Sequence, residues 1–170
     1  MTGVADITAP DLAVLFCGIN PGMRSGQLGQ HFARPGNRFW KLLAASGLTD
    51  RLLAPSEQDR LLGYGLGITN LVEATTASAA ELSTADLRAG APRLEEKVVA
   101  LAPRFVAVLG MQAYRSAFRR SQATLGRQPE MLGSSVLWLL PNPSGLQARY
   151  QLPEMTEMWI ELACAVDARG

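Results

Sequence analysis

Histidine and cysteine are scarce in this sequence, which contains one histidine and two cysteines among its 170 residues. Structural zinc sites usually take four ligands from these residue types, so we predict that the protein has no metal site. Cys17 lies in an apolar run and Cys164 in a late helical pattern. We therefore expect both to be reduced thiols in the core of a cytosolic protein.

The sequence also has no large excess of positive or negative charge and no long apolar run. The formal net charge is +1, so no overall field indicates a nucleic-acid partner, and DNA binding would depend on local arginine clusters. No apolar run approaches the roughly 18 residues that a membrane-spanning helix needs. The first ten residues lack the basic start and apolar core of a signal peptide. We therefore expect a cytoplasmic protein without membrane contact.

Apolar residues, by contrast, make up 48% of the chain, which excludes an intrinsically disordered protein. A chain of this length usually folds as one domain. It can bury roughly 70% of its unfolded surface, and so needs no disulfide or metal for stability. We expect residues 1–10 to form a flexible N-terminal tail and residues 11–170 to form a single domain.

Four short apolar runs predict the strands of a buried sheet, at residues 12–18, 65–70, 105–109 and 136–140. The first run is apolar without alternation from Leu12 to Phe16, which is typical of a strand covered on both faces. Helical patterns lie between the runs. This alternation predicts an α/β fold, a three-layer α/β/α sandwich with a short central parallel sheet.

Helix-capping residues, glycines and prolines predict where the helices and loops begin and end. Asn37 is a good N-cap residue, and it predicts a helix over residues 37–46. A short helix over residues 83–90 is expected to end at its glycine, and Pro92 to begin another helix. Residues 19–36 predict a long loop, of a length that is often functional.

Polar or glycine-rich segments follow the predicted strands, at residues 19–22, 69–70, 110–112 and 142–145. The carboxyl ends of parallel strands lie at one edge of the sheet, and α/β proteins bind ligands there. We therefore expect these segments to form a ligand site. Taken alone, the Asn20-Pro21-Gly22 stretch could be an ordinary turn, because these are common turn residues.

Several of these segments, with their neighbours, resemble the motifs of one enzyme family. Residues 18–22 read Gly-Ile-Asn-Pro-Gly, and residues 32–41 read Phe-Ala-Arg-Pro-Gly-Asn-Arg-Phe-Trp-Lys. Residues 67–72 read Gly-Ile-Thr-Asn-Leu-Val, and residues 142–146 read Asn-Pro-Ser-Gly-Leu. In this order and spacing they resemble the mismatch-specific uracil/thymine-DNA glycosylases, and especially the bacterial G:U mismatch-specific uracil-DNA glycosylases.

The resemblance implies a uracil-DNA glycosylase-like fold and a monofunctional DNA glycosylase. Such an enzyme flips a mispaired uracil or related pyrimidine out of double-stranded DNA and hydrolyses its N-glycosidic bond, without a cofactor. Flipping costs a few kcal/mol, least for a mispaired base. The sugar becomes oxocarbenium-like, and fixed donors must meet the negative charge on the departing base. We expect a monomer that works at the bacterial nucleoid.

Two residues are catalytic candidates by this resemblance. Asn20 matches the family residue that holds the attacking water, and its amide is a poor proton acceptor, so we expect slow turnover. Asp86 lies in a segment similar to one that often carries Glu in the family. A carboxylate there could take a proton or stabilise the sugar cation. Asp86 is equally explained as an acid in a first helical turn, where acids are favoured.

The substrate-binding residues are likewise implied by the resemblance. Phe32 matches the residue that stacks on the flipped base, although it could instead be a core anchor. Ser25 lies where relatives crowd the pyrimidine 5-position, and Asn70 lies where some relatives have Lys. The residues expected to bind substrate are Ile19, Gly22, Ser25, Phe32, Asn70 and Asn142.

The turn after the last predicted strand is expected to enter DNA. Leu146 is an apolar residue at a polar tip, which suits a wedge that fills the hole left by a flipped base. Relatives tend to carry an Arg soon after Gly-Leu to read the unpaired guanine, whereas here Arg149 comes slightly late. The residues expected to contact DNA are Ser144, Gly145, Leu146 and Arg149. The cations Arg34, Arg38 and Lys41 either contact phosphates or form a solvated helix face.

Two other functions stay open from the sequence. A small α/β nucleotide hydrolase could bind phosphate with the glycine-rich residues 22–29, but that loop has no Lys, Asp or Glu to manage a metal-bound phosphate. A non-enzymatic lesion-binding protein of the same fold would suit the weak amide chemistry. Release of uracil from a G·U duplex separates the three functions.

Overall fold

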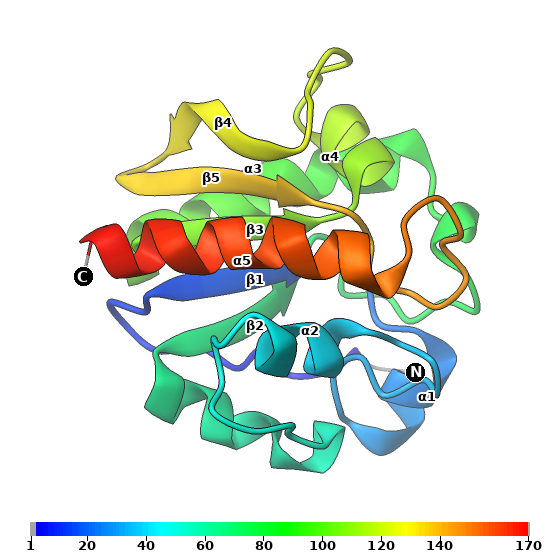
Figure 1. The fold of residues 1–170 in the computed structure, drawn as a ribbon. Helices are drawn as coiled ribbons and strands as arrows, with labels where there is room; N and C mark the ends of the chain where they lie inside the picture. The colour runs from blue at the N-terminus through cyan, green and yellow to red at the C-terminus, as the bar shows by residue number, and fades with distance from the viewer. Residues whose placement is uncertain (1–2, 170) are drawn as a thin grey trace.

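The computed structural model describes residues 3–169, and Figure 1 shows a central sheet with helices packed against it. The strands are β1 (Val14–Gly18), β2 (Leu66–Asn70), β3 (Phe105–Leu109), β4 (Gly126–Leu132) and β5 (Ser135–Leu140). The α-helices are α1 (Met23–Leu28), α2 (Phe39–Ala45), α3 (Thr84–Leu101), α4 (Met111–Ala117) and α5 (Leu152–Arg169). Two 3-10 helices are η1 (Pro55–Tyr64) and η2 (Ala79–Glu81).

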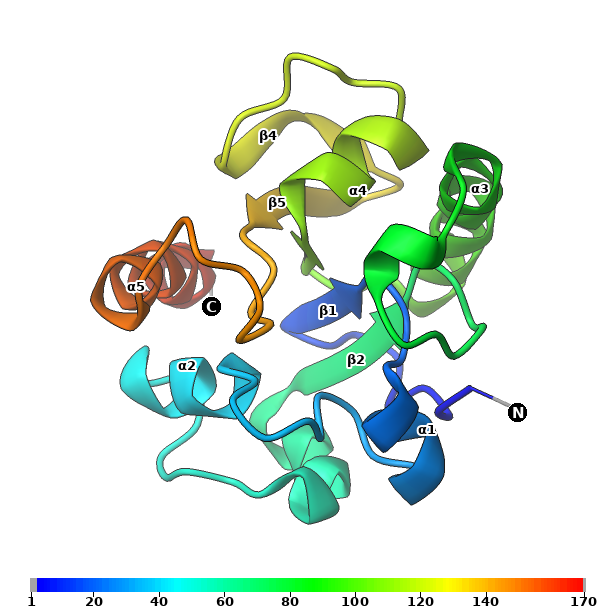
Figure 2. The same cartoon turned by 90° about the vertical axis from the view of Figure 1, so that its right-hand side faces the viewer.

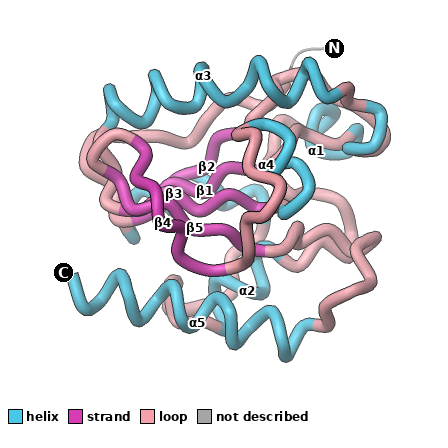
Figure 3. Tube along the Cα trace, turned by 90° about the horizontal axis from the view of Figure 1, so that it is seen from above, coloured by secondary structure: helices cyan, strands magenta, loops and turns pink. Residues whose placement is uncertain are grey.

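The strands form one sheet in the order β2-β1-β3-β5-β4. Strand β1 runs parallel to β2 and β3, and β3 runs parallel to β5. Helices α2 and α5 pack on one face and α3 and α4 on the other, as Figure 3 shows from above. The alternating strand side chains enter two separate cores, one on each face. This confirms the predicted α/β fold with helices on both faces of a mostly parallel sheet.

Strand β4 was not predicted, and it makes the sheet mixed rather than wholly parallel. It pairs antiparallel with β5 at the edge of the sheet, with a register shift between Arg127 and Met131. The strand contains Pro129, and only Gln128 and Leu132 are buried. Proline and irregular pairing are tolerated at a sheet edge, so this strand lacks the continuous apolar run of the central strands.

The N-terminal residues 3–10 are anchored to the sheet, which differs from the expected flexible tail; Met1 and Thr2 lie outside the described residues. Ile7 is buried and pairs with Ile68 of β2 through two backbone hydrogen bonds of 2.9 Å. Asp6 forms an ion pair with Lys97 of α3. The pairing partners are distant in sequence, so no local pattern could indicate this attachment.

Helix α2 confirms the helix expected after Asn37, whose Oδ1 accepts a hydrogen bond from the backbone N–H of Phe39 at 3.0 Å. The segment expected to be one long loop, residues 19–36, contains the short helix α1. Helix α1 ends at Gly29, which adopts a left-handed conformation with a φ of 65°, the usual geometry of a glycine C-cap.

The two helices expected after residue 83 form one continuous helix, α3, that includes both Gly90 and Pro92. A Cβ atom at position 90 would collide with the backbone carbonyl of Leu71. Glycine at this position therefore permits α3 to pack closely on the segment after β2 and does not end the helix. The helix ends instead at Ala102, which has a φ of 50°.

Candidate active site

The parallel strands β1, β2, β3 and β5 open at their carboxyl ends into one cavity of about 680 Å³. Figure 2 looks onto this edge of the molecule. The turn after β1, helix α1, the loop around Phe32, the loop before η2 and the turn after β5 all contribute to the lining. A cavity of this volume is typical of small-ligand sites, and its position is the one expected from the strand order.

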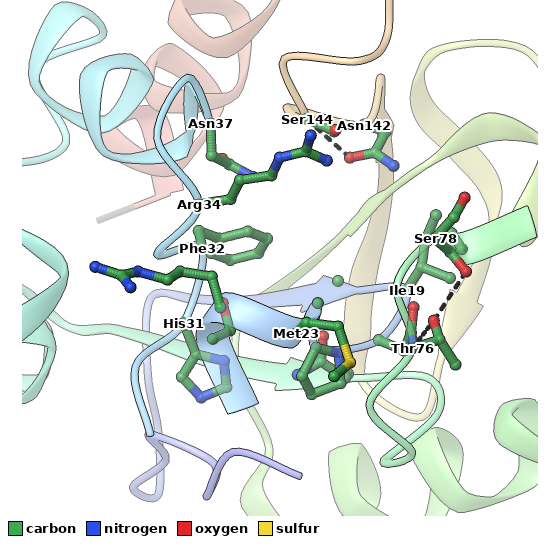
Figure 4. Close-up of a pocket in the computed structure, with 18 of the residues that line it drawn as sticks. Ile19, Met23, His31, Phe32, Arg34, Asn37, Thr76, Ser78, Asn142 and Ser144 are labelled. Carbon is green, nitrogen blue, oxygen red and sulfur yellow. Dashed lines mark hydrogen bonds between the residues drawn. The ribbon is translucent and has the colours of Figure 1, made fainter. Parts of the chain in front are cut away.

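Most of the predicted site residues line this cavity: Ile19, Asn20, Gly22, Ser25, Phe32, Asn70, Asn142, Ser144 and Leu146. In Figure 4 Phe32 occupies the middle, with Ile19 and Thr76 on one side and Asn142 above it. The predicted residues outside the lining are Asp86, Gly145 and Arg149. Most of the residues predicted from the sequence therefore line one cavity, and their roles there stay predictions.

The amide of Asn20, directly after β1, is held by the neighbouring loop. Its Nδ2 donates hydrogen bonds to the carbonyl of Ala74 at 2.7 Å and to Oγ1 of Thr76 at 2.8 Å. Thr76 Oγ1 donates its own hydrogen to the carbonyl of Ser78 at 2.8 Å, so it must accept from Asn20. Both amide hydrogens are therefore used, and Oδ1 is left as the acceptor that this cavity-lining side chain offers a ligand.

Phe32 offers one aromatic face to the cavity, because its other face stacks on Phe39 at a ring distance of 4.1 Å and an angle of 22°. Its φ of 51° is left-handed, a conformation that non-glycine residues rarely adopt and that is common at functional sites. Gly18 supports this arrangement. A Cβ atom there would lie 2.6 Å from Asn70 Oδ1 and 3.2 Å from Phe32 Cζ, so glycine lets both side chains lie against β1.

Ser25 joins α1 to the loop that carries Phe32. The side chain is buried, and its Oγ accepts a hydrogen bond from the backbone N–H of Ala33 at 3.1 Å. The hydroxyl hydrogen remains available to a ligand, because a hydroxyl both donates and accepts. A small polar side chain is therefore fixed at the wall of the cavity next to the Phe32 loop.

The β5–α5 loop (residues 141–151) forms the opposite wall and turns sharply after β5. Asn142 Oδ1 accepts from the backbone N–H of Ser144 at 3.0 Å, and Ser144 Oγ accepts from the N–H of Leu146 at 3.2 Å. Because Asn142 Oδ1 is engaged, its amide hydrogens remain as donors toward the cavity. Leu146 lies at the rim with 65% of its surface exposed.

Arg38, which was expected either to contact phosphates or to lie on a solvated helix face, instead binds the β5–α5 loop beside the cavity. Its guanidinium donates to the backbone carbonyls of four residues of the β5–α5 loop: Pro143, Ser144, Gln147 and Tyr150. The side chain is half-buried. No local sequence signal indicates these bonds, because the partners lie more than a hundred positions further along the chain.

Gly145 and Arg149 belong to the same loop without lining the cavity. A Cβ atom at Gly145 would lie 2.7 Å from the carbonyl oxygen of Gly36, so the loop packs backbone to backbone on the segment before α2. Arg149 is exposed, and its guanidinium carbon lies 5.4 Å from the centre of the Tyr150 ring. Arg149 therefore contacts the Tyr150 ring and does not line the cavity.

Asp86 occupies the first turn of α3, away from the cavity. Its Oδ2 accepts from the backbone N–H of Ser83 at 2.9 Å, and its own N–H donates to Ser83 Oγ at 3.0 Å. This reciprocal pair is a capping box. The backbone N–H and then the hydroxyl of Ser83 lower the pKa of Asp86. The structure therefore places the second catalytic candidate in a helix cap and does not bring it to Asn20.

Among the residues that the structure describes, the cavity lining contains no carboxylate, and its charged members are Arg24 and Arg34. His31 also lines it, with Nε2 at 2.7 Å from the carbonyl oxygen of Ala5, and burial lowers the pKa of this imidazole. The site therefore lacks a carboxylate base, and its amides and hydroxyls are the groups that can orient a water molecule. It can stabilise negative charge better than positive charge.

Residues 3–169 contain no group of three or more His, Cys, Asp or Glu side chains that could hold a metal ion. Within the same range, none of the helices is both long and apolar enough to cross a membrane.

Comparison with known proteins identifies the family and the fold of the chain. The family model of the uracil DNA glycosylase superfamily matches residues 5–163. The fold is similar to the solution NMR structure of a candidate uracil DNA glycosylase from Methanosarcina acetivorans, with a TM-score of 0.60 and 18% identity over 96% of this chain and 99% of that chain. At this identity the second match establishes the fold alone. The chain therefore belongs to the uracil DNA glycosylase superfamily, which makes it a DNA glycosylase, a hydrolase that acts on DNA.

Proposed function

We propose that the protein is a monofunctional, mismatch-specific uracil DNA glycosylase. It extrudes a mispaired uracil or related pyrimidine from double-stranded DNA, hydrolyses the N-glycosidic bond and leaves an abasic site. The observation that carries this proposal is one cavity that joins an oriented amide (Asn20), an available aromatic face (Phe32) and an exposed apolar tip (Leu146). In this proposal the chain acts as one monomeric domain, in the cytoplasm and without a cofactor.

The extruded base would stack on the free face of Phe32. The opposite face of that ring already rests on Phe39, so stacking requires little reorganisation. Stacking on an aromatic ring is worth about 1–3 kcal/mol per base. The remaining contacts to the base would come from residues that surround the ring: Ile19 and Gly22 at the base edge, Ser25 near the 5-position, and Asn70 and Asn142.

Asn20 would hold the nucleophilic water. Its two amide hydrogens are committed to Ala74 and Thr76, so Oδ1 can accept one hydrogen from a water placed against the anomeric carbon. The water oxygen then bonds to that carbon as the glycosidic C–N bond breaks, and the bonding electrons leave with the base. An amide cannot retain the proton of the water, so the proton passes to solvent after the sugar has become cationic.

The departing pyrimidine would be stabilised by donors and by cationic surroundings. Asn142 keeps its amide hydrogens for the base because its Oδ1 accepts from Ser144. Arg24 and Arg34 give the cavity a positive lining without any carboxylate to oppose it. The loss of one such fixed donor commonly lowers the rate of a reaction 10²–10³-fold.

Preference for mispairs follows from the same lack of a carboxylate base. A site whose amide only orients water stabilises the transition state weakly. The free-energy cost of extruding the base therefore has a large effect on the rate. That cost is least for a mispaired base. Leu146, with Ser144 and Gly145 beside it, would fill the gap in the duplex, and Arg149 would contact the strand at the outside of the loop.

Asp86 enters this proposal as a helix-capping residue. Both of its observed hydrogen bonds go to Ser83, and its side chain does not line the cavity. The lowered pKa of Asp86 also suits an ionised cap better than a proton-accepting group, because a carboxylate with a low pKa is a weaker base.

Single-turnover excision tests the proposal on duplexes that contain G·U, A·U and G·T pairs and on single-stranded uracil DNA. We expect uracil to be released fastest from the G·U pair. Equal rates on G·U and A·U would remove the mismatch preference and leave a general uracil glycosylase. Tight binding to G·U without release would indicate a lesion-binding protein, and hydrolysis of free nucleotides would indicate a nucleotide hydrolase.

A further inference from the structure

We infer that Arg38 is a positioning residue that holds the β5–α5 loop, and with it Leu146, in a fixed relation to Phe32. This inference rests on the proposed function of that loop as the element that enters DNA. Arg38 touches neither the cavity nor the reacting atoms; its effect would reach the reaction through the placement of Leu146.

The contacts of Arg38 span almost the whole loop. Nε donates to the carbonyl of Pro143 at 3.3 Å and Nη1 to that of Tyr150 at 2.8 Å. Nη2 donates to the carbonyls of Ser144 at 2.8 Å and Gln147 at 3.1 Å. The backbone N–H of Arg38 also donates to the carbonyl of Pro143, at 2.9 Å. One planar guanidinium thus determines how four peptide groups are oriented.

Only arginine can make this set of bonds. Its five N–H donors lie in one plane in a fixed fork, whereas the three donors of lysine lie on a single nitrogen. The other hydrogen bonds of residues 142–150 are local, such as those within Asn142–Ser144 and Gln147–Tyr150. Among the described residues, the hydrogen bonds observed between this stretch and the chain before β5 all come from Arg38.

The same segment also carries the aromatic face. Phe39, the next residue, is fully buried and supports Phe32 from below. Gly36 packs against Gly145 of the loop. Residues 36–39 therefore contact the loop through Arg38 and Gly36 and the Phe32 ring through Phe39, so the Arg38 side chain can be removed without removing the support of that ring. Asn20 is held separately, by Ala74 and Thr76.

This separation gives a specific test with two duplexes, one with a G·U pair and one in which uracil faces an abasic-site analogue. In the second duplex the uracil has no partner base from which it must be separated, so its excision should depend less on Leu146. Arg38→Met should lower the single-turnover rate on G·U about 10- to 100-fold and change the rate on the second duplex by less than about threefold. Arg93→Met, a change of an exposed arginine on α3, should alter neither rate.

Leu146→Ala should show the same pattern, and the double variant with Arg38→Met should lose little more than either single variant, because both changes remove one function. Arg38→Lys should lose less than Arg38→Met. Equal loss on both duplexes, or losses that multiply in the double variant, would overturn the inference.

Amide hydrogen exchange tests the positioning role without any activity. Arg38→Met should speed exchange at the backbone amides of residues 144–150 and leave the central strands protected; Arg38→Lys serves if the methionine variant does not fold. Unchanged exchange in the loop would overturn the inference. If the wild-type protein releases no uracil, the proposed function fails on its own, and the exchange result still decides whether Arg38 orders the loop.

Discussion

The two walls of the cavity are built in different ways. On the Asn20 side, residues 18–22 and 71–76 continue the pairing of β1 and β2, through bonds such as Leu71 N–H to the Gly18 carbonyl and Thr76 N–H to the Pro21 carbonyl. On the Leu146 side, the loop has left the sheet and one arginine side chain orders it. Backbone pairing gives a rigid support to Asn20, the residue proposed to hold water, whereas the loop of Leu146, the residue proposed to enter DNA, depends on one replaceable side chain.

A substitution in the Asn20 wall is expected to lower the excision rate on every substrate. Asn20→Ala removes the acceptor for the water and both bonds to the neighbouring loop. We expect excision to fall about 10²–10³-fold by similar factors on G·U duplex and on uracil that faces an abasic analogue. Single-turnover rates on both duplexes measure this, with thermal unfolding as the control for folding. A loss confined to the G·U duplex would contradict the division between the two walls.

Phe32 lies between the walls and should show an intermediate effect. Phe32→Ala removes the stacking surface for the base, a contribution of about 1–3 kcal/mol, so we expect a loss of about 10- to 100-fold on both duplexes. Phe32→Leu, which keeps apolar bulk without a flat ring, serves as the matched variant. Full activity of Phe32→Leu would mean that the side chain acts as a core anchor and that base stacking is not its role.

Asp86 belongs to neither wall of the cavity, so we expect its replacement to leave the excision rate unchanged. Asp86→Ala removes the capping box with Ser83, so the expected effect is a lower thermal midpoint. Excision should stay within about twofold of wild type. A large loss of excision with an unchanged midpoint would restore Asp86 as a catalytic residue.

Replacement of His31 is expected to have the smallest effect, a change in how folding stability depends on pH. Burial lowers its pKa in the folded protein, so the unfolded chain binds the proton more readily and folding stability falls as pH drops through about 6.5. The thermal midpoint should therefore fall between pH 7.5 and pH 5.5, and fall less in His31→Gln. Identical pH dependence in both proteins would show that His31 contributes nothing to it.

The central strands and the cavity were predictable because they depend on local chemistry. Val14 to Phe16 are apolar without alternation, which requires burial on both faces, and Asn20 follows at a strand end, where parallel sheets bind ligands. Strand β4 was not predictable in this way, because an edge strand with Pro129 carries little apolar signal. The local pattern around Gly90 predicts a helix end, whereas the actual role of this glycine is a close contact with Leu71, which precedes the helix in the chain.

The α/β fold class and most of the side chains of the cavity could be predicted from local patterns, since buried strands and polar strand ends are recognisable in a sequence. The hydrogen-bond partners of those side chains could not: both amide hydrogens of Asn20 are committed, Asp86 caps a helix, and Arg38 binds the β5–α5 loop. A hydrogen bond depends on distance and direction in space, and the partners of Asn20 and Arg38 lie far from them along the chain.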